Sequence, residues 1–260
     1  MCKLPADMKW SFSKLEAFKH CGMMFKLTYL DNAERSDNGF SDYGTFCHTL
    51  MEEWAKGKCP DFALAEEFES RYDSAVTHSF PPFPRGMEQK YFDQGVAYFD
   101  SFNGFGDHYE VLTAEEKFEV NIGGYTIVGI ADLTMRNLDT GGIIVIDHKT
   151  KSDATMKKEL NTFRMQLYTY AAFVKQKFGV YPEELAFNMI RTGQMIREPF
   201  DMAMYDKTCN WIVDTIHEIE QCRDWVVSSS SFFCRYVCSV FDSCPIRDAI
   251  LYGNKTKGEV

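Results

Sequence analysis

The sequence has 260 residues, of which 45% are hydrophobic and 25% are charged, as in an ordinary globular protein. No apolar run approaches the roughly 20 residues of a membrane span, and the amino terminus lacks a signal-peptide core, so we expect a cytoplasmic protein without membrane contact. The net charge of −10 argues against a broad nucleic-acid-binding surface but leaves room for a local basic path.

The amino-terminal part of the chain predicts helices. Residues 10–30 place apolar side chains at roughly helical spacing after Ser11 or Ser13, either of which could cap the first turn. Further helices are predicted over residues 42–57, 61–76 and 87–102, and Gly57 ends the first of these. The proline-rich stretch "SFPPFPRG", residues 79–86, predicts a turn between the last two.

The central part of the chain predicts a sheet. Residues 110–122, 125–135 and 142–150 predict three strands, and the short turn-like segments between them favour a meander. A long helix over residues 155–178, strands over 184–193 and 195–200, a helix over 205–226 and a tail rich in serine and cysteine are expected to follow. Helices flanking a small central sheet give an α/β or α+β fold.

Two acids and a lysine lie near the ends of two adjacent predicted strands. Asp132 is in one strand, and Asp147 and Lys149 share one face of the next because side chains alternate along a strand. Carboxylates suit Mg²⁺ or Mn²⁺, which activates water against a phosphodiester, and a lysine stabilises the developing charge. The alternative is that these charges end two ordinary strands in solvent.

The segments "GIADL", "VIDHKT" and "QLYTY" resemble, in this order, the motifs of the PD-(D/E)XK nuclease superfamily. The sequence is most similar to the RecB/AddB-like branch, which includes the CRISPR-associated iron–sulfur exonucleases. Residues 10–30 resemble the opening helix of that branch, and "YGTFCHTLME" resembles its motif with a glycine, here Gly44, before a histidine, here His48. Glu115 with Phe118 resembles its first strand.

The resemblance implies a restriction-endonuclease-like core with a small mixed sheet and a metal-dependent DNA exonuclease that acts on single strands or DNA ends. It implies that Lys149 is the catalytic lysine. It implies metal-binding positions at His48, Asp132 and Asp147 and at the backbone carbonyl of His148. It also implies that Gln166 and Tyr170 lie on one helix along the DNA. Each has a simpler explanation: the helical residues could pack in the core, and Glu115 could be solvated. We expect the His148 side chain to point to the strand face opposite Asp147.

The cysteines carry a second implication of the resemblance. Nine cysteines are many for a compartment that disfavours disulfides. The related nucleases hold a structural [4Fe–4S] cluster with one cysteine before the core and three after it, here Cys21, Cys234, Cys238 and Cys244. Three residues separate Cys234 from Cys238 where the family usually has two, although both would face one side if that segment is helical. Zinc could take the same thiolates, or the thiols could be core residues.

We therefore expect one nuclease domain over residues 1–260, with a helical insertion at about 45–110 and an iron–sulfur region at 228–250 together with Cys21. Basic residues after Lys149 form a candidate path for DNA, and Tyr168, Tyr170 and Phe173 could stack on bases or belong to the core. The alternative function is a non-catalytic DNA-binding or adaptor protein of the same fold in a recombination or CRISPR-adaptation complex. The presence of all the catalytic-type residues favours the nuclease.

Overall fold

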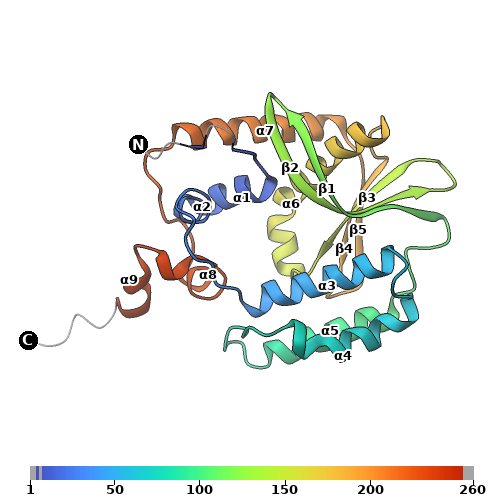
Figure 1. Cartoon of the computed structure of the whole chain (residues 1–260), viewed down its shortest axis with the longest axis horizontal. Helices are drawn as coiled ribbons and strands as arrows, with labels where there is room; N and C mark the ends of the chain where they lie inside the picture. The colour runs from blue at the N-terminus through green and yellow to red at the C-terminus, as the bar shows by residue number, and fades with distance from the viewer. Residues whose placement is uncertain (1–3, 6–7, 254–260) are drawn as a thin grey trace, which may run out of the picture.

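A five-stranded mixed sheet organises the fold (Figure 1). The computed structural model describes residues 4–5 and 8–253. The strands follow one another across the sheet in chain order: β1 (Tyr109–Ile122), β2 (Tyr125–Asn137), β3 (Ile143–Lys149), β4 (Glu184–Met189) and β5 (Gln194–Pro199). Strands β3 and β4 are parallel, and the other neighbours are antiparallel. The predicted meander of the first three strands and the mixed α/β class are confirmed.

The helices flank this sheet. They are α1 (Phe12–His20), α2 (Gly22–Tyr29), α3 (Gly39–Ala55), α4 (Leu64–Ala75), α5 (Met87–Ser101), α6 (Asp153–Phe178), α7 (Met202–Gln221), α8 (Ser231–Tyr236) and α9 (Arg247–Tyr252). Helix α6 links β3 to β4, because a parallel pair requires a crossover too long for a hairpin. No helix in the described part of the chain is both long and apolar enough to cross a membrane.

Each face of the sheet has its own apolar core. On one face Val145 packs with Leu167 of α6 and Ile212 of α7. On the other face Ile144 and its neighbours pack against the end of α3, which in turn packs on α4 and α5. Burial on both faces explains why β3 is apolar at four successive residues instead of alternating.

The long crossover helix α6 is set by its ends. The Ser152 hydroxyl accepts a hydrogen bond from the Thr155 amide, and Gly179 ends the helix with φ of 78°. The predicted helix over residues 155–178 is therefore confirmed to within two residues. The predicted last long helix was too long, because α7 ends at Gln221, before Trp225.

The prediction of a single helix over residues 10–30 was wrong. Cys21 has extended backbone dihedrals and separates α1 from α2. A segment that comes after α7 packs at this break: the Met23 amide donates to the Val226 carbonyl, and the Ser228 hydroxyl donates to the His20 carbonyl. Figure 1 shows the result, with α2 and α8 side by side although they lie at opposite ends of the chain. The break thus depends on contacts that helical spacing does not report.

Candidate active site

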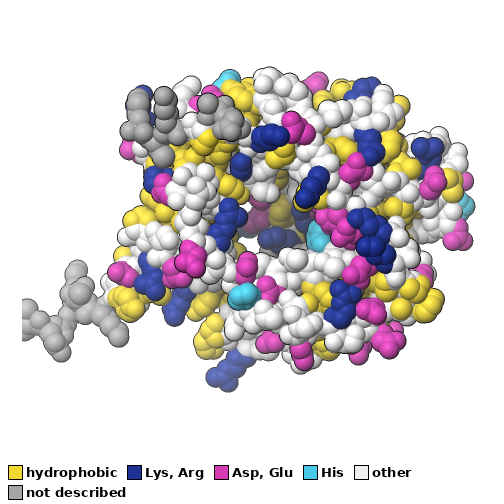
Figure 2. Space-filling model, in the orientation of Figure 1, with side chains coloured by type: hydrophobic (Ala, Val, Ile, Leu, Met, Phe, Trp, Pro, Cys, Tyr) yellow, Lys and Arg dark blue, Asp and Glu magenta, His cyan; other side chains and the backbone are white. Residues whose placement is uncertain are grey.

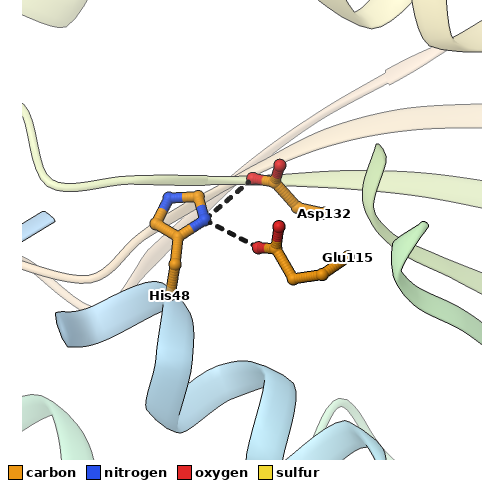
Figure 3. A group of neighbouring side chains, drawn as sticks. All are labelled: His48, Glu115 and Asp132. Carbon is orange, nitrogen blue, oxygen red and sulfur yellow. Dashed lines mark hydrogen bonds and ion pairs between the residues drawn. The ribbon is translucent and has the colours of Figure 1, made fainter. Parts of the chain in front are cut away.

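Three side chains from three different elements converge in a hollow at the edge of the sheet. His48 projects from α3, Glu115 from β1 and Asp132 from β2, and one ligand atom of each lies within 4.8 Å of the others (Figure 3). The His48 Nδ1 atom is 3.0 Å from Glu115 Oε1 and 3.6 Å from Asp132 Oδ2. Figure 2 shows the hollow between α1 and α3, with acidic, basic and histidine side chains inside it.

The backbone at Glu115 is distorted in a way that serves this convergence. Its φ of 49° lies in the left-handed region, which costs a residue other than glycine about 1–3 kcal/mol. The β1–β2 ladder pairs Ala114 with Leu133 and Glu116 with Ala131, but it skips the step between Glu115 and Asp132. Residues directly opposite each other in an antiparallel pair share one face of the sheet, and both carboxylates lie close to His48.

Glu115 was predicted only as part of the first strand and not as a ligand, yet the sequence carries a signal for it. Ile122 pairs with Tyr125 across the two glycines of the turn. A two-residue turn sets the register of a hairpin, and counting back from it puts Glu115 opposite Asp132. The acid at that position could therefore have been identified as a partner of Asp132.

The second acid reaches the site through the register of β2 and β3. Leu133 pairs with Ile146, so Asp132 and Asp147 occupy the next step of the ladder. The His148 amide donates to Asp132 Oδ2 at 2.8 Å, and the His148 carbonyl oxygen lies 3.0 Å from His48 Nε2. The sequence-predicted His48, Asp132, Asp147 and the backbone of His148 are thus brought together.

Lys149 and the two predicted residues of α6 form a chain of contacts. The Lys149 Nζ atom lies 2.7 Å from Asp147 Oδ2 and donates to Gln166 Oε1 at 2.7 Å. The Gln166 amide nitrogen donates to the Tyr170 hydroxyl at 2.7 Å. Gln166 and Tyr170 face the same way because residues four apart share one face of a helix. The lysine is therefore held between the strand and α6.

The acids carry more charge than the local cations neutralise. Burial, with the charge of Asp147, raises the pKa of Asp132 well above its usual value, against the opposing effect of His48 and Lys149. Burial alone would lower the pKa of His48, but the hydrogen bond with Glu115 and the nearby Asp132 outweigh it and raise the pKa to about 9. The raised pKa of His48 reflects carboxylates that favour a positive charge beside them.

The donor set fits a hard divalent cation. Asp147 is 1% exposed, and its Oδ2 atom has no well-directed hydrogen bond among the described residues, although the Lys149 ammonium lies nearby. Carboxylate oxygens and a backbone carbonyl are the ligands that Mg²⁺ and Mn²⁺ prefer, and an imidazole favours Mn²⁺ further. An oxygen-rich site with a surplus of negative charge is what such an ion requires.

The His148 side chain lies on the other face of β3, away from Asp147 and Lys149. Its Nδ1 atom lies 3.0 Å from the Asn188 amide nitrogen, which also donates to the Tyr98 hydroxyl of α5 at 2.6 Å. Burial, assisted by the charges of His48 and Lys149, holds the pKa of His148 well below its usual value, so the imidazole is neutral and Nδ1 accepts. This buried network fixes the residue whose backbone enters the site.

Glu16 of α1 is an additional carboxylate near the site. It is partly buried and makes no hydrogen bond or ion pair with the described residues. Burial raises its pKa, and the charges of Lys149 and Lys151 offset that effect only in part.

The predicted basic path is shorter than the sequence suggested. Arg164 pairs with Glu198, Arg197 pairs with Glu184 and Lys177 pairs with Glu116, so these cations are neutralised locally. Among the basic residues from Lys149 to Arg197, the exposed lysines that make no ion pair with the described residues are Lys151, Lys157, Lys158 and Lys175. Tyr168, Tyr170 and Phe173 could have stacked on bases or packed in the core. In the structure all three are buried in the hydrophobic core.

A second candidate centre lies where the chain ends meet. Cys21, Cys234, Cys238 and Cys244 line one small apolar pocket. Cys21 lies at the break between α1 and α2, and α8 ends before Cys238, so the segment from Cys234 to Cys238 is not one continuous helix and the condition for a shared helix face is not met. Burial and the neighbouring thiols raise the pKa of Cys238 to about 11.

The spacing of these sulfur atoms bears on the metal they could hold. No three of the four Sγ atoms lie within 4.8 Å of one another, although all four residues are described. Four thiolates on one zinc ion at about 2.3 Å would lie about 3.8 Å apart. In an iron–sulfur cluster each thiolate binds a different iron, so wider spacing is expected.

Comparison with known proteins identifies one family through its sequence model. The family model of the PD-(D/E)XK nuclease superfamily matches residues 9–245. Among solved structures, the protein designated SSO0001 is 26% identical, with a TM-score of 0.31 over 52% of this chain and 60% of that one, less than two thirds of its length. A candidate exonuclease from Eubacterium rectale is 11% identical, with a TM-score of 0.41 over 82% of this chain and 77% of that one. No curated protein matches the sequence.

Proposed function

The chain belongs to the PD-(D/E)XK nuclease superfamily, and we propose that it is a metal-dependent exonuclease that hydrolyses DNA from single strands or ends. The observation that carries the proposal is the convergence of His48, Glu115 and Asp132 beside Asp147 and Lys149. These are the groups needed to bind a divalent cation and to stabilise a phosphodiester under attack. A histidine from a helix before the sheet also supports the RecB/AddB-like branch.

We assign the metal to the carboxylates and the histidine, with the backbone carbonyl of the residue between acid and lysine as a further ligand: His48, Glu115, Asp132, Asp147 and His148. A bound Mg²⁺ or Mn²⁺ would polarise the phosphate and lower the pKa of a bound water. His48 must lose its proton to act as a ligand, so metal and proton compete for it.

Lys149 is the residue placed to stabilise negative charge on the substrate. An ammonium has three N–H donors, of which Gln166 accepts one, and Asp147 lies beside the ammonium as its ion-pair partner. A donor therefore remains for a phosphate oxygen as charge develops on it. Tyr170 holds Gln166, and Gln166 holds the lysine, so α6 keeps this donor in position without needing to move during the reaction.

We propose that the four cysteines hold a structural [4Fe–4S] cluster. The shared pocket supports this assignment. The cluster would join α1 and α2 to the segment after α7, and closing so long a loop removes several kcal/mol of entropy from the unfolded chain, by analogy with a disulfide at about 4–5 kcal/mol. Protein purified without oxygen should be brown and absorb broadly near 400 nm, as thiolate-bound iron–sulfur clusters do.

We also propose that the described elements form one nuclease domain in which α4 and α5 belong to a helical insertion. The support is that α4 and α5 pack mainly on each other and on α3, and that α5 also reaches β4 through the hydrogen bond between Tyr98 and Asn188. Residues 1–3, 6–7 and 254–260 of the predicted domain lie outside the described part of the chain.

The experiment that tests the function uses linear and circular DNA. Single- and double-stranded substrates labelled at either end are incubated with Mg²⁺, with Mn²⁺ or with EDTA, and Asp147→Asn is the matched inactive variant. We expect metal-dependent digestion of linear single strands and no cleavage of circular ones. If circular DNA is cleaved as fast as linear DNA, the protein is an endonuclease and the proposed exonuclease activity is wrong. DNA binding without cleavage in either metal would favour the alternative, a non-catalytic DNA-binding member of a recombination or CRISPR-adaptation complex.

A further inference from the structure

Arg191 lies at the same edge of the sheet as the catalytic lysine. Strands β3 and β4 are parallel, Met189 pairs with Lys149, and the Ile190 amide donates to the Lys149 carbonyl oxygen at 3.0 Å. Neighbouring strands are about 4.8 Å apart and each residue adds about 3.3 Å, so the Arg191 Cα lies within roughly 10 Å of the Lys149 Cα. Arg191 is therefore fastened close to the end of the catalytic strand.

The charge of Arg191 is buried without an acid to neutralise it. Its side chain belongs to a residue that is 9% exposed, and no Asp or Glu oxygen of the described residues lies within 4.0 Å of its nitrogens. Its contacts are neutral: Nε donates to Gln94 Oε1 at 2.8 Å, and Nη1 donates to the Tyr91 hydroxyl at 2.9 Å. The guanidinium also stacks 3.8 Å above the Tyr91 ring. Buried cations are usually paired with an anionic group, so we expect a bound anion to pair with Arg191.

The guanidinium borders a cleft large enough for a nucleotide. The cleft has a volume of about 580 Å³ and lies between α5 and the turn that follows β4. Lys90 adds a second positive charge to its lining, whereas the lining acid Asp93 already accepts a hydrogen bond from Gln89. The formal charge of the lining is therefore +1, from two cations and one acid. Ile190 supplies an apolar wall.

We propose that this cleft binds a phosphate group, carried either by the DNA strand beyond the scissile bond or by a released nucleotide, with Arg191 as its anchor. The Nη2 atom of Arg191 makes no hydrogen bond with the described residues, and a guanidinium edge matches two phosphate oxygens. The hydrogen bonds with Gln94 and Tyr91 hold the guanidinium group in position before the ligand binds. This inference rests on the proposed nuclease function, because that function supplies both phosphate sources.

The test measures binding without catalysis, so that it can fail independently of the nuclease assignment. A fluorescent single-stranded oligonucleotide is titrated in EDTA with wild type, Arg191→Gln and Arg191→Lys over a range of salt concentrations. We expect Arg191→Gln to weaken binding roughly tenfold, since a charge-assisted hydrogen bond is lost. The slope of log affinity against log salt should fall by about 0.7, as for one phosphate contact on a single strand. Arg191→Lys should restore most of the salt slope.

A second arm identifies the source of the phosphate. Melting temperatures are recorded with inorganic phosphate and with a deoxynucleoside monophosphate, each against chloride at the same ionic strength. If the strand is the source, oligonucleotide binding depends on Arg191; if the released nucleotide is the source, only the wild-type melting temperature rises with the monophosphate.

The proposal is overturned if Arg191→Gln, shown to be folded by circular dichroism, matches wild type in both arms. A purely structural arginine would lower the melting temperature of the variant equally with and without phosphate, and that outcome also rejects the anion site.

Discussion

Replacing Lys149 by methionine should separate catalysis from metal binding. The ammonium is 2.7 Å from Asp147 Oδ2, but it supplies no ligand atom, and methionine keeps most of its apolar stem. Removing one preorganised donor from a developing oxyanion costs about 10²–10³ in kcat. We therefore expect Lys149→Met to lose that factor with little change in KM.

The same change should leave metal binding intact or make it tighter. A cation held by Asp147 would lie within roughly 5 Å of the ammonium, and at an effective dielectric of about 20 the repulsion amounts to several kcal/mol. Without metal, however, the variant leaves Asp147 buried with no cation beside it, which costs about 3–5 kcal/mol of stability. Added Mn²⁺ should therefore raise the melting temperature of Lys149→Met more than that of wild type.

The assay combines single-turnover cleavage of a labelled single strand with Mn²⁺ titration by calorimetry. Asp147→Asn provides the ligand-loss reference and should lose both cleavage and metal affinity. Lys207→Met, at an exposed lysine of α7 away from the site, provides the matched control and should resemble wild type. The reasoning is refuted if Lys149→Met cleaves at the wild-type rate, or if it binds Mn²⁺ as poorly as Asp147→Asn.

Four further predictions follow from the geometry. His48→Ala should weaken Mn²⁺ affinity before it affects DNA binding, and Mn²⁺ should support wild-type activity at least as well as Mg²⁺; unchanged titrations in the variant would remove the imidazole from the ligand set. Cys238→Ser should bleach the absorption near 400 nm and lower the melting temperature by roughly 10 °C, while the surviving folded protein keeps its specific activity; a colourless variant that melts like wild type would make the thiol a core residue. Asn188→Leu should lower metal affinity roughly 10–100-fold, because the histidine whose backbone enters the site loses its side-chain anchor, and Tyr98→Phe, which leaves that anchor in place, should have a smaller effect in the same calorimetric titration. Glu16 has a pKa raised by burial, so ionisation opposes folding: Glu16→Gln should raise the urea midpoint more at high pH, where the wild-type carboxyl is ionised, than at low pH, where it is protonated in both states, whereas a pH-independent effect would point to a packing change.

The sequence was sufficient to predict most of the local elements and their order. The apolar run of β3, the two-glycine turn and the capped helix α6 are each specified by residues close together in the chain, and each formed close to its predicted position. The alternation of side chains also put Asp147 and Lys149 on one face and the His148 side chain on the other. Local stereochemistry governs these features, so local patterns report them.

Contacts between distant segments decided the features that the sequence missed. Cys21 interrupts a helical pattern because the chain after α7 supplies hydrogen bonds at the break, more than two hundred residues away. The three basic residues of α6 and β5 that the sequence offered to DNA are neutralised by acids on neighbouring elements, and their pairing depends on how strands and helix pack.

The site itself divides in the same way. The identities of His48, Asp132, Asp147 and Lys149 could be predicted from the order of motifs. Glu115 could also have been identified by counting the register back from the two-glycine turn, whereas its left-handed backbone is visible only in the structure. The buried charge of Arg191 was visible in the sequence only as one more basic residue. A charged side chain can be neutralised by a neighbour, solvated, or buried without a partner where a ligand can bind. Which of these occurs depends on the atoms around it, and only the tertiary structure determines them.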